Sequence, residues 1–248
     1  MSQSEPVKWG PFAGVMVTIM AFILAQAIGV LLLLAAAVIF SGQGLENLEG
    51  SGLLRTPTYV FLGNIFISGS LFGLAYGFIR LRRGKLTTVG LRRPRVADIG
   101  LAIGGYLAYF ASYLFVTILV KANAPHWLDQ TQEIGYSRSA EGTVLIPIFV
   151  SLVLLAPIVE EFLFRGFLYT GLRQKLNIWW ATGVTSLLFA AAHLFGGETS
   201  ALLWIAGIDT LILSIVLCQL RERTGRLWAP MLVHAIKNGI AFTVLFIF

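Results

Sequence analysis

Seven long apolar stretches constrain this chain more than any other feature. Most approach or exceed the roughly 20 residues that an α-helix needs to cross about 30 Å of hydrocarbon. Lipid offers no hydrogen-bond partner to the backbone, so such stretches must be helical. The expected spans are residues 11–40, 59–79, 99–120, 144–172, 178–195, 201–220 and 227–248. The sequence therefore predicts an all-α, polytopic transmembrane helix bundle of about seven spans.

The composition excludes an ordinary soluble domain. Hydrophobic residues make up 57% of the chain and charged residues 12%, with a mean hydropathy of +0.81, whereas soluble domains have about 45–50% and about 25%. The net charge of +6 does not indicate a nucleic-acid partner, because basic residues of membrane proteins collect in cytoplasmic loops. We expect an integral membrane protein, with the lipid bilayer around it.

The positions of lysine and arginine predict the orientation. Basic residues fill the loops after the second, fourth and sixth spans, and the alternate loops hold few. The positive-inside rule therefore places the amino terminus in the cytoplasm. The first of the basic loops, residues 80–97, either lies on anionic lipid or is a solvated loop that sets the topology.

The chain reads as one integral membrane domain, residues 1–248, without a long repeat or a low-complexity tail. Residues 1–143 contain three accessory spans whose interiors hold no charged residue or histidine, and small residues there indicate close helix packing. Residues 144–248 contain all the motifs described below. The sequence indicates no oligomeric state.

Two acids and one arginine interrupt the fourth span, at Glu160, Glu161 and Arg165. Each charge costs roughly 2.5–3.5 kcal/mol at the centre of a bilayer, so a function is expected. Glu161 and Arg165 are four residues apart on one helix face and can neutralise each other. Pro157 leaves an upstream carbonyl without its helical partner. Either Glu160 remains free for chemistry, or all three charges form a buried cluster that only fixes helix packing.

Three further polar side chains lie in the later spans. His193 follows three alanines, and taken alone such a histidine is more typical of a satisfied core residue. His234 and Asn238 share a helix face, where they could hold an oxygen that gains negative charge or could bond neighbouring helices. Together with a free carboxylate, these groups could deprotonate water, attack a peptide carbonyl and stabilise the tetrahedral intermediate.

The three motifs resemble those of a known family, the intramembrane glutamic endopeptidases that include type II CAAX prenyl proteases and bacteriocin-processing or immunity proteins. The matching motifs are E-E-x-x-x-R at Glu160 to Arg165, F-x-x-x-H at Phe189 to His193, and H-x-x-x-N at His234 to Asn238. The order and spacing also match, and the resemblance covers about residues 156–241.

The resemblance implies a role for each motif residue. Glu160 would activate water with help from His193, and His234 with Asn238 would form the oxyanion hole. Glu161 and Arg165 would be structural support. The implied activity is an endopeptidase without a cofactor that acts on a peptide or a membrane protein, and we expect it in a bacterial inner (cytoplasmic) membrane.

Two other activities remain open. The histidines and carboxylates could ligate zinc in a metalloprotease, although no H-E-x-x-H is present. The chain could also be a non-catalytic membrane immunity or scaffold protein. Asp209 and Lys237 lie outside the motifs and either pair across the bundle or face a water-filled cavity. We expect an aqueous cavity that opens toward the cytoplasm or sideways to lipid.

Overall fold

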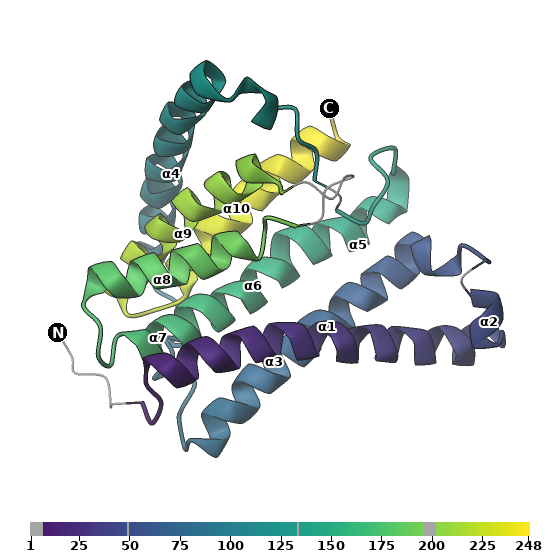
Figure 1. Cartoon of the computed structure of the whole chain (residues 1–248), viewed down its shortest axis with the longest axis horizontal. Coiled ribbons are helices and arrows are strands. Elements are labelled where there is room, and N and C mark those ends of the chain that lie inside the picture. The colour runs from purple at the N-terminus through teal and green to yellow at the C-terminus, as the bar shows by residue number, and fades with distance from the viewer. Residues whose placement is uncertain (1–6, 49, 133, 196–201) are drawn as a thin grey trace.

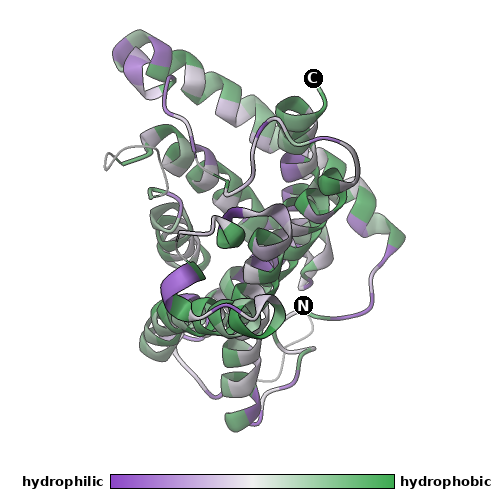
Figure 2. Cartoon of the chain, turned by 90° about the vertical axis from the view of Figure 1, so that its right-hand side faces the viewer, coloured by the Kyte–Doolittle hydropathy of each residue, from purple (hydrophilic) through white to green (hydrophobic). Residues whose placement is uncertain are grey.

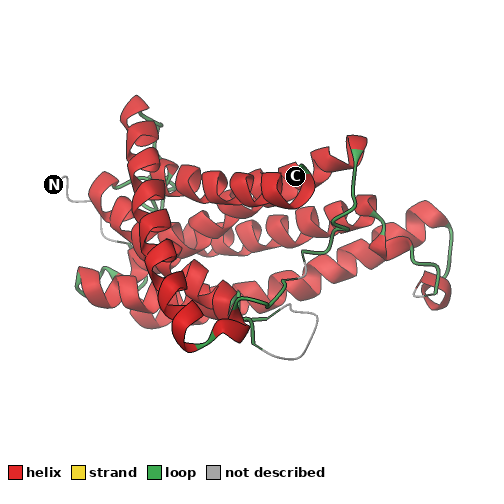
Figure 3. Cartoon of the chain, turned by 90° about the horizontal axis from the view of Figure 1, so that it is seen from above, coloured by secondary structure: helices red, strands yellow, loops and turns green. Residues whose placement is uncertain are grey.

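The computed structural model describes residues 7–48, 50–132, 134–195 and 202–248, and within these ranges it contains helices and no β-strand (Figures 1 and 3). The α-helices are α1 (Pro11–Ser41), α2 (Leu45–Leu48), α3 (Pro57–Leu81), α4 (Val96–Asn123), α5 (Leu145–Phe149), α6 (Ala156–Glu161), α7 (Tyr169–Leu172), α8 (Ile178–Ala191), α9 (Trp204–Thr224) and α10 (Trp228–Phe246). Three short 3₁₀ turns are η1 (Leu53–Arg55), η2 (Pro125–Trp127) and η3 (Gly142–Val144). Two π-helical segments are η4 (Val150–Leu155) and η5 (Phe162–Leu168).

The all-helical membrane fold agrees with the prediction. Six helical segments in the described ranges are long and apolar enough to cross a bilayer: α1, α3, α4, Gly142–Leu172, α9 and α10. The fifth expected span is α8, whose 14 residues extend only about 21 Å at 1.5 Å per residue. The predicted start of the sixth span at residue 201 lies outside the described residues. The cytoplasmic amino terminus stays a prediction.

Segment Gly142–Leu172 lies at the centre of the bundle. In Figure 1, α1 and α3 lie on one side of it, and α4, α8, α9 and α10 lie on the other. The residues of its second half, from Glu161 to Leu172, are all buried. Figure 2 shows hydrophobic residues over most of the helix surfaces, with hydrophilic residues mainly in loops and near helix ends. This distribution is the one expected of helices that face lipid.

Close helix contacts depend on small residues. At Gly29 of α1, a Cβ atom would stand 2.4 Å from the side chain of Ile67 in α3, so only glycine permits this approach. Proline occupies the first turn of both helices, where its missing amide hydrogen costs nothing. The accessory spans therefore pack as the small residues indicate.

The basic loop after α3 packs against the start of α10 and is not solvated along its whole length. Val89 is fully buried. The Leu227 amide donates to the Gly90 carbonyl at 3.1 Å, and the Trp228 indole donates to the Arg92 carbonyl. Gly90 adopts a φ of 93° that favours glycine. This loop therefore fixes the first turn of the helix that carries His234.

Candidate active site

The helix around Glu160 changes type twice. The short α6 lies between the π segments η4 and η5, and π turns occur frequently at functional sites. In η4 the Ala156 amide donates to the Ser151 carbonyl, five residues back. In the same pattern, the Leu152 carbonyl would accept a hydrogen bond from the amide of residue 157, but residue 157 is proline and has no amide hydrogen. The Leu152 carbonyl instead accepts the side-chain amide of Asn238 at 2.8 Å.

A buried ion pair lies next to Glu160. Arg165 Nη1 donates to Glu161 Oε1 at 2.8 Å, and both side chains are 0% exposed. The guanidinium also lies over the ring of Phe189, at 4.4 Å from its centroid, which is a favourable cation–π arrangement. This pair is the one that the four-residue spacing predicts.

The same carboxylate also positions His234. Glu161 Oε1 accepts a hydrogen from His234 Nδ1 at 3.0 Å, and the imidazole is only 5% exposed. A carboxylate that pairs with arginine is an acceptor only, so it fixes the hydrogen on Nδ1 and directs Nε2 away. Glu161 therefore holds a site histidine as well as Arg165, a contact that the spacing of the motifs does not predict.

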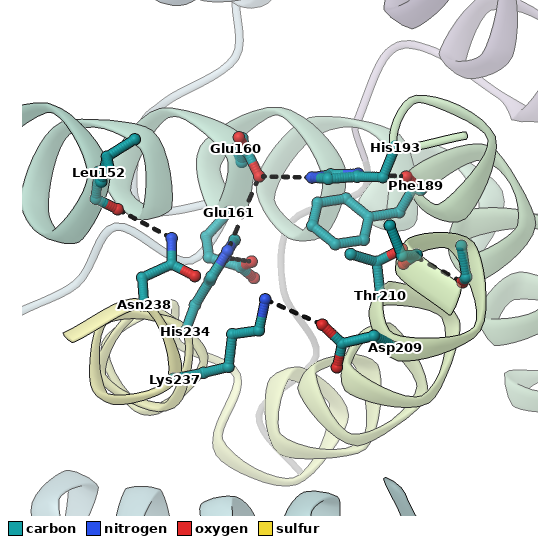
Figure 4. Close-up of polar contacts among 12 residues, drawn as sticks. Leu152, Glu160, Glu161, Phe189, His193, Asp209, Thr210, His234, Lys237 and Asn238 are labelled. Carbon is teal, nitrogen blue, oxygen red and sulfur yellow. Dashed lines mark hydrogen bonds and ion pairs between the residues drawn. The ribbon is translucent and has the colours of Figure 1, made fainter. Parts of the chain in front are cut away.

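The Glu160 carboxylate lies apart from that of Glu161 and faces His193 and His234, as Figure 4 shows. Its Oε2 lies 3.8 Å from His234 Nε2 and 4.0 Å from His193 Nε2. Oε2 itself has no hydrogen-bond partner among the described residues. Separations of this size are long for a direct hydrogen bond and suit a bridging water. The structure thus brings together three groups, which come from α6, α10 and the turn that follows α8.

The two histidines present equivalent nitrogens to Glu160. His193 Nδ1 lies 2.8 Å from the Phe189 carbonyl, which can only accept, so this nitrogen carries the hydrogen. The hydrogen of His234 is likewise on Nδ1. In the neutral form each Nε2 is therefore an acceptor that faces the carboxylate, and a molecule between the three must be a donor.

Glu160 and His193 line two cavities. A cavity of about 320 Å³ lies toward α1 and α3, and a cavity of about 310 Å³ lies toward α9 and α10. The second is also lined by His234 and Asn238. The motif residues therefore border internal space that a chain segment could occupy. The direction in which this space opens stays a prediction.

Asn238 makes a structural hydrogen bond in addition to lining the cavity. Its carboxamide has two N–H groups, and one of them is used by the Leu152 carbonyl. The other remains available to the 310 Å³ cavity that Asn238 lines. Asn238 thus ties α10 to the π segment η4, while its role as an oxyanion donor stays a prediction.

Asp209 and Lys237 pair with each other. Lys237 Nζ lies 3.0 Å from Asp209 Oδ2, and the hydroxyl of Tyr109 donates to the other carboxylate oxygen. The pair joins α9, α10 and α4, and Lys237 also lines the 310 Å³ cavity. Of the two possibilities that the sequence left open, the structure shows the pairing across the bundle. Tyr109 carried no signal in the sequence beyond being a polar aromatic residue in an apolar span.

Sequence patterns indicate no functional role for the first two spans, yet these spans line the site. Gln26, Asn64 and Ser68 contribute to the 320 Å³ cavity opposite Glu160 and His193. Gln26 and Thr18 are the only polar residues between 11 and 40, and that isolation was the available signal. In the described part of the chain, no three His, Cys, Asp or Glu side chains form a group that could hold a metal ion.

Comparisons with known proteins find one matching family and several relatives. Residues 142–240 match the family described as "Rce1-like: Type II CAAX prenyl endopeptidase Rce1-like". The chain is 35% identical over 134 residues to "Uncharacterized protein YpbD" of Bacillus subtilis (strain 168), covering 53% of this chain and 65% of that protein. It is 27% identical over 157 residues to "Putative membrane peptidase YdiL" of the same organism, covering 60% of this chain and 58% of that protein.

A third relative is an "Uncharacterized 24.3 kDa protein" of Escherichia coli, 33% identical over 97 residues that cover 38% of this chain and 42% of that protein. The matches thus span between 42% and 65% of the relatives' lengths. No solved structure matches the chain. The resemblance indicated by the three motifs is confirmed: in residues 142–240 this membrane protein is similar to the Rce1-like type II CAAX prenyl endopeptidases.

Proposed function

We propose that this protein is an intramembrane endopeptidase in which Glu160 activates a water molecule without a metal ion. The observation that carries the proposal is the approach of Glu160 Oε2 to the Nε2 atoms of His193 and His234, at 4.0 and 3.8 Å, beside two cavities. Glu160 Oε2 and the Nε2 atom of neutral His193 are both acceptors, and a water molecule between them can supply its two hydrogens, one to each.

The first step uses the free carboxylate. Glu160 takes one proton from the water, and the resulting hydroxide attacks the carbonyl carbon of the peptide bond. His193 Nε2 accepts the remaining hydrogen and orients the attacking oxygen, since its ring is fixed by the Phe189 carbonyl. The proton held by Glu160 then moves to the leaving amine when the tetrahedral intermediate collapses.

The carbonyl oxygen gains negative charge during the attack. The free N–H of Asn238 can donate to this oxygen. His234 Nε2 donates to it only when the ring is an imidazolium, and the Glu161 carboxylate at 3.0 Å stabilises that charge. Glu161 and Arg165 therefore act on the reaction through the position and charge of His234.

The comparisons support a peptide or a membrane protein as the substrate. The matching family is described as a CAAX prenyl endopeptidase, and one relative is named as a membrane peptidase. The relatives come from bacteria, which supports a bacterial inner membrane as the location. A substrate that reaches the site from within the bilayer suits a protein whose motif residues lie on membrane helices.

The test compares purified wild-type protein with Glu160→Gln on internally quenched peptides, one ending in a farnesylated CAAX tetrapeptide and one with the same residues unprenylated. We expect the variant to lose a factor of about 10²–10⁴ in kcat, the range typical of a general base. Glu46→Gln on the exposed α2 is the matched control. A Glu160→Gln enzyme that stays within threefold of wild type would contradict the proposal.

A zinc protease is the competing mechanism, because histidine and glutamate are residue types that ligate zinc in proteins. Incubation with 1,10-phenanthroline followed by gel filtration distinguishes the two. We expect unchanged rates. Loss of activity with recovery on added Zn²⁺ would favour the metal mechanism.

A further inference from the structure

We infer that α1 and α3, which lie outside the family-matched residues 142–240, supply a binding wall for the backbone of an extended peptide. Gln26 and Asn64 are the residues that carry it. The inference rests on the proposed function and adds how the substrate is held beside Glu160. The substrate class is an extended polypeptide segment recognised through its amide groups.

The first argument is the position of this wall. The 320 Å³ cavity is bounded on one side by Glu160 and His193 and on the other by Gln26, Asn64 and Ser68. A segment that places a peptide bond at Glu160 would therefore lie against the two carboxamides. A carboxamide offers both a donor and an acceptor, which is what a backbone amide and carbonyl require.

The second argument is the free-energy cost of placing the polar side chain of Gln26 in a membrane helix. This side chain is exposed in an apolar, 31-residue membrane helix, and no described residue hydrogen-bonds to it. An unsatisfied amide away from water costs several kcal/mol, roughly 4–8 in a solvent without hydrogen bonds. A polar ligand in the adjacent cavity would remove that cost. Leucine or alanine would otherwise suit this position better.

The third argument is the way in which Asn64 is held. Its Nδ2 donates to the Tyr136 hydroxyl at 3.2 Å, and that hydroxyl lies 3.0 Å from Ser151 Oγ in η4. The carboxamide is therefore fixed to the same helical segment that carries Glu160. One N–H group and the carbonyl oxygen of Asn64 remain for a ligand in the cavity.

A neighbouring cavity suits the side chains of such a segment. It has a volume of about 530 Å³, lies between α1 and α8, and shares Gln26 and Phe164 with the first cavity. Its lining is otherwise mostly apolar. The wall would thus bind the peptide backbone while the adjoining space takes apolar groups of the same segment.

The first test measures KM and kcat separately for Gln26→Leu with the farnesylated CAAX peptide. Loss of one hydrogen bond predicts a rise in KM of roughly 3- to 10-fold with kcat within twofold of wild type. Gln43→Leu, the same change in an exposed loop, should leave both unchanged. Because no described residue bonds to Gln26, this variant should fold normally. An unchanged KM would overturn the inference.

The second test identifies the backbone as the bound group. Peptides are N-methylated one amide at a time within three residues of the scissile bond. At one position we expect a penalty of roughly 3- to 10-fold in wild type that is absent in Gln26→Leu, because the same hydrogen bond is removed from either side. Penalties that are identical in the two proteins at every position would overturn the inference.

A binding measurement separates this inference from the proposed function. Binding of a fluorescein-labelled farnesylated CAAX peptide is followed by anisotropy in Glu160→Gln protein, with and without Gln26→Leu. A Kd that rises roughly 3- to 10-fold supports the wall, and an unchanged Kd overturns it. Absence of hydrolysis by wild-type protein would overturn the proposed function alone.

Discussion

Two regions of the molecule differ in how much of their surface faces lipid: the N-terminal helices α1, α3 and α4, and the C-terminal segments from Gly142 onward. In their most apolar 18-residue windows, 17–22% of the N-terminal residues are buried, against 28–44% in the long C-terminal spans. The N-terminal helices present large apolar side chains to lipid, for example Leu31 at 66% exposure. The C-terminal helices bury Glu161, Arg165 and His234, which must be satisfied inside the protein.

The difference teaches that lipid exposure and chemistry are distributed separately. Helices that face lipid need apolar surface and small contact residues, whereas helices that hold charges need partners at defined distances. The predicted effects of substitution should therefore be large in one region and small in the other. Polar contacts between the regions should lie in between.

The largest effect is expected for Glu161→Gln. The change leaves the Arg165 charge buried without its 2.8 Å partner, and breaking a buried pair costs about 3–5 kcal/mol in the free energy of unfolding. Denaturant unfolding in micelles measures this loss, with exposed Glu46→Gln as the control. The double variant Glu161→Gln, Arg165→Met should recover part of the stability. Equal stability of Glu161→Gln and wild type would contradict the claim that the C-terminal helices depend on satisfied buried charges.

A smaller effect is expected for Asn238→Ala. Removal of an oxyanion donor lowers kcat by about 10²- to 10³-fold, and the lost bond to the Leu152 carbonyl lowers stability by about 1 kcal/mol. Initial rates and thermal unfolding separate the two. Asn123→Ala is the matched control, because Asn123 also donates to a helix carbonyl, at 2.8 Å, but at an exposed site. A loss of stability without a loss of kcat would make Asn238 purely structural.

Tyr136→Phe tests a contact between the two regions. Its hydroxyl joins Asn64 of α3 to Ser151 of η4, and its loss should cost about 0.5–1.5 kcal/mol. Tyr76→Phe is the control, because no described residue hydrogen-bonds to that hydroxyl. Thermal unfolding of the two variants side by side gives the difference. Equal unfolding temperatures would show that this hydroxyl adds nothing to the contact between the two regions.

The smallest effect is expected for Leu31→Ala, which changes a lipid-facing side chain of α1. Its stability should stay within about 0.5 kcal/mol of wild type. Leu163→Ala, at a fully buried position of η5, should lose about 2–5 kcal/mol. Unfolding in the same micelle measures both. Comparable losses at the two positions would indicate that Leu31 is covered, by a second copy or another protein.

The helices could be predicted because lipid enforces one periodicity over long stretches. The Glu161–Arg165 pair could also be predicted, because residues four apart meet on any α-helix. The partner of Asn238 could not. In a regular α-helix, Pro157 would free the carbonyl of Val153, whereas the π turn frees that of Leu152. Gln26 and Asn64 were missed because their positions beside Glu160 arise from contacts between distant parts of the chain.

The two π segments make the site depend on residue number as well as residue type. Each wide turn holds more residues than an α turn, and one residue corresponds to about 100° of rotation around the helix. A chain with the same motifs but one residue fewer between Phe149 and Pro157 would turn its first glutamate toward different neighbours. A relative that keeps every motif residue but has a different number of residues between the positions of Phe149 and Pro157 would therefore direct its glutamate side chain toward other neighbours.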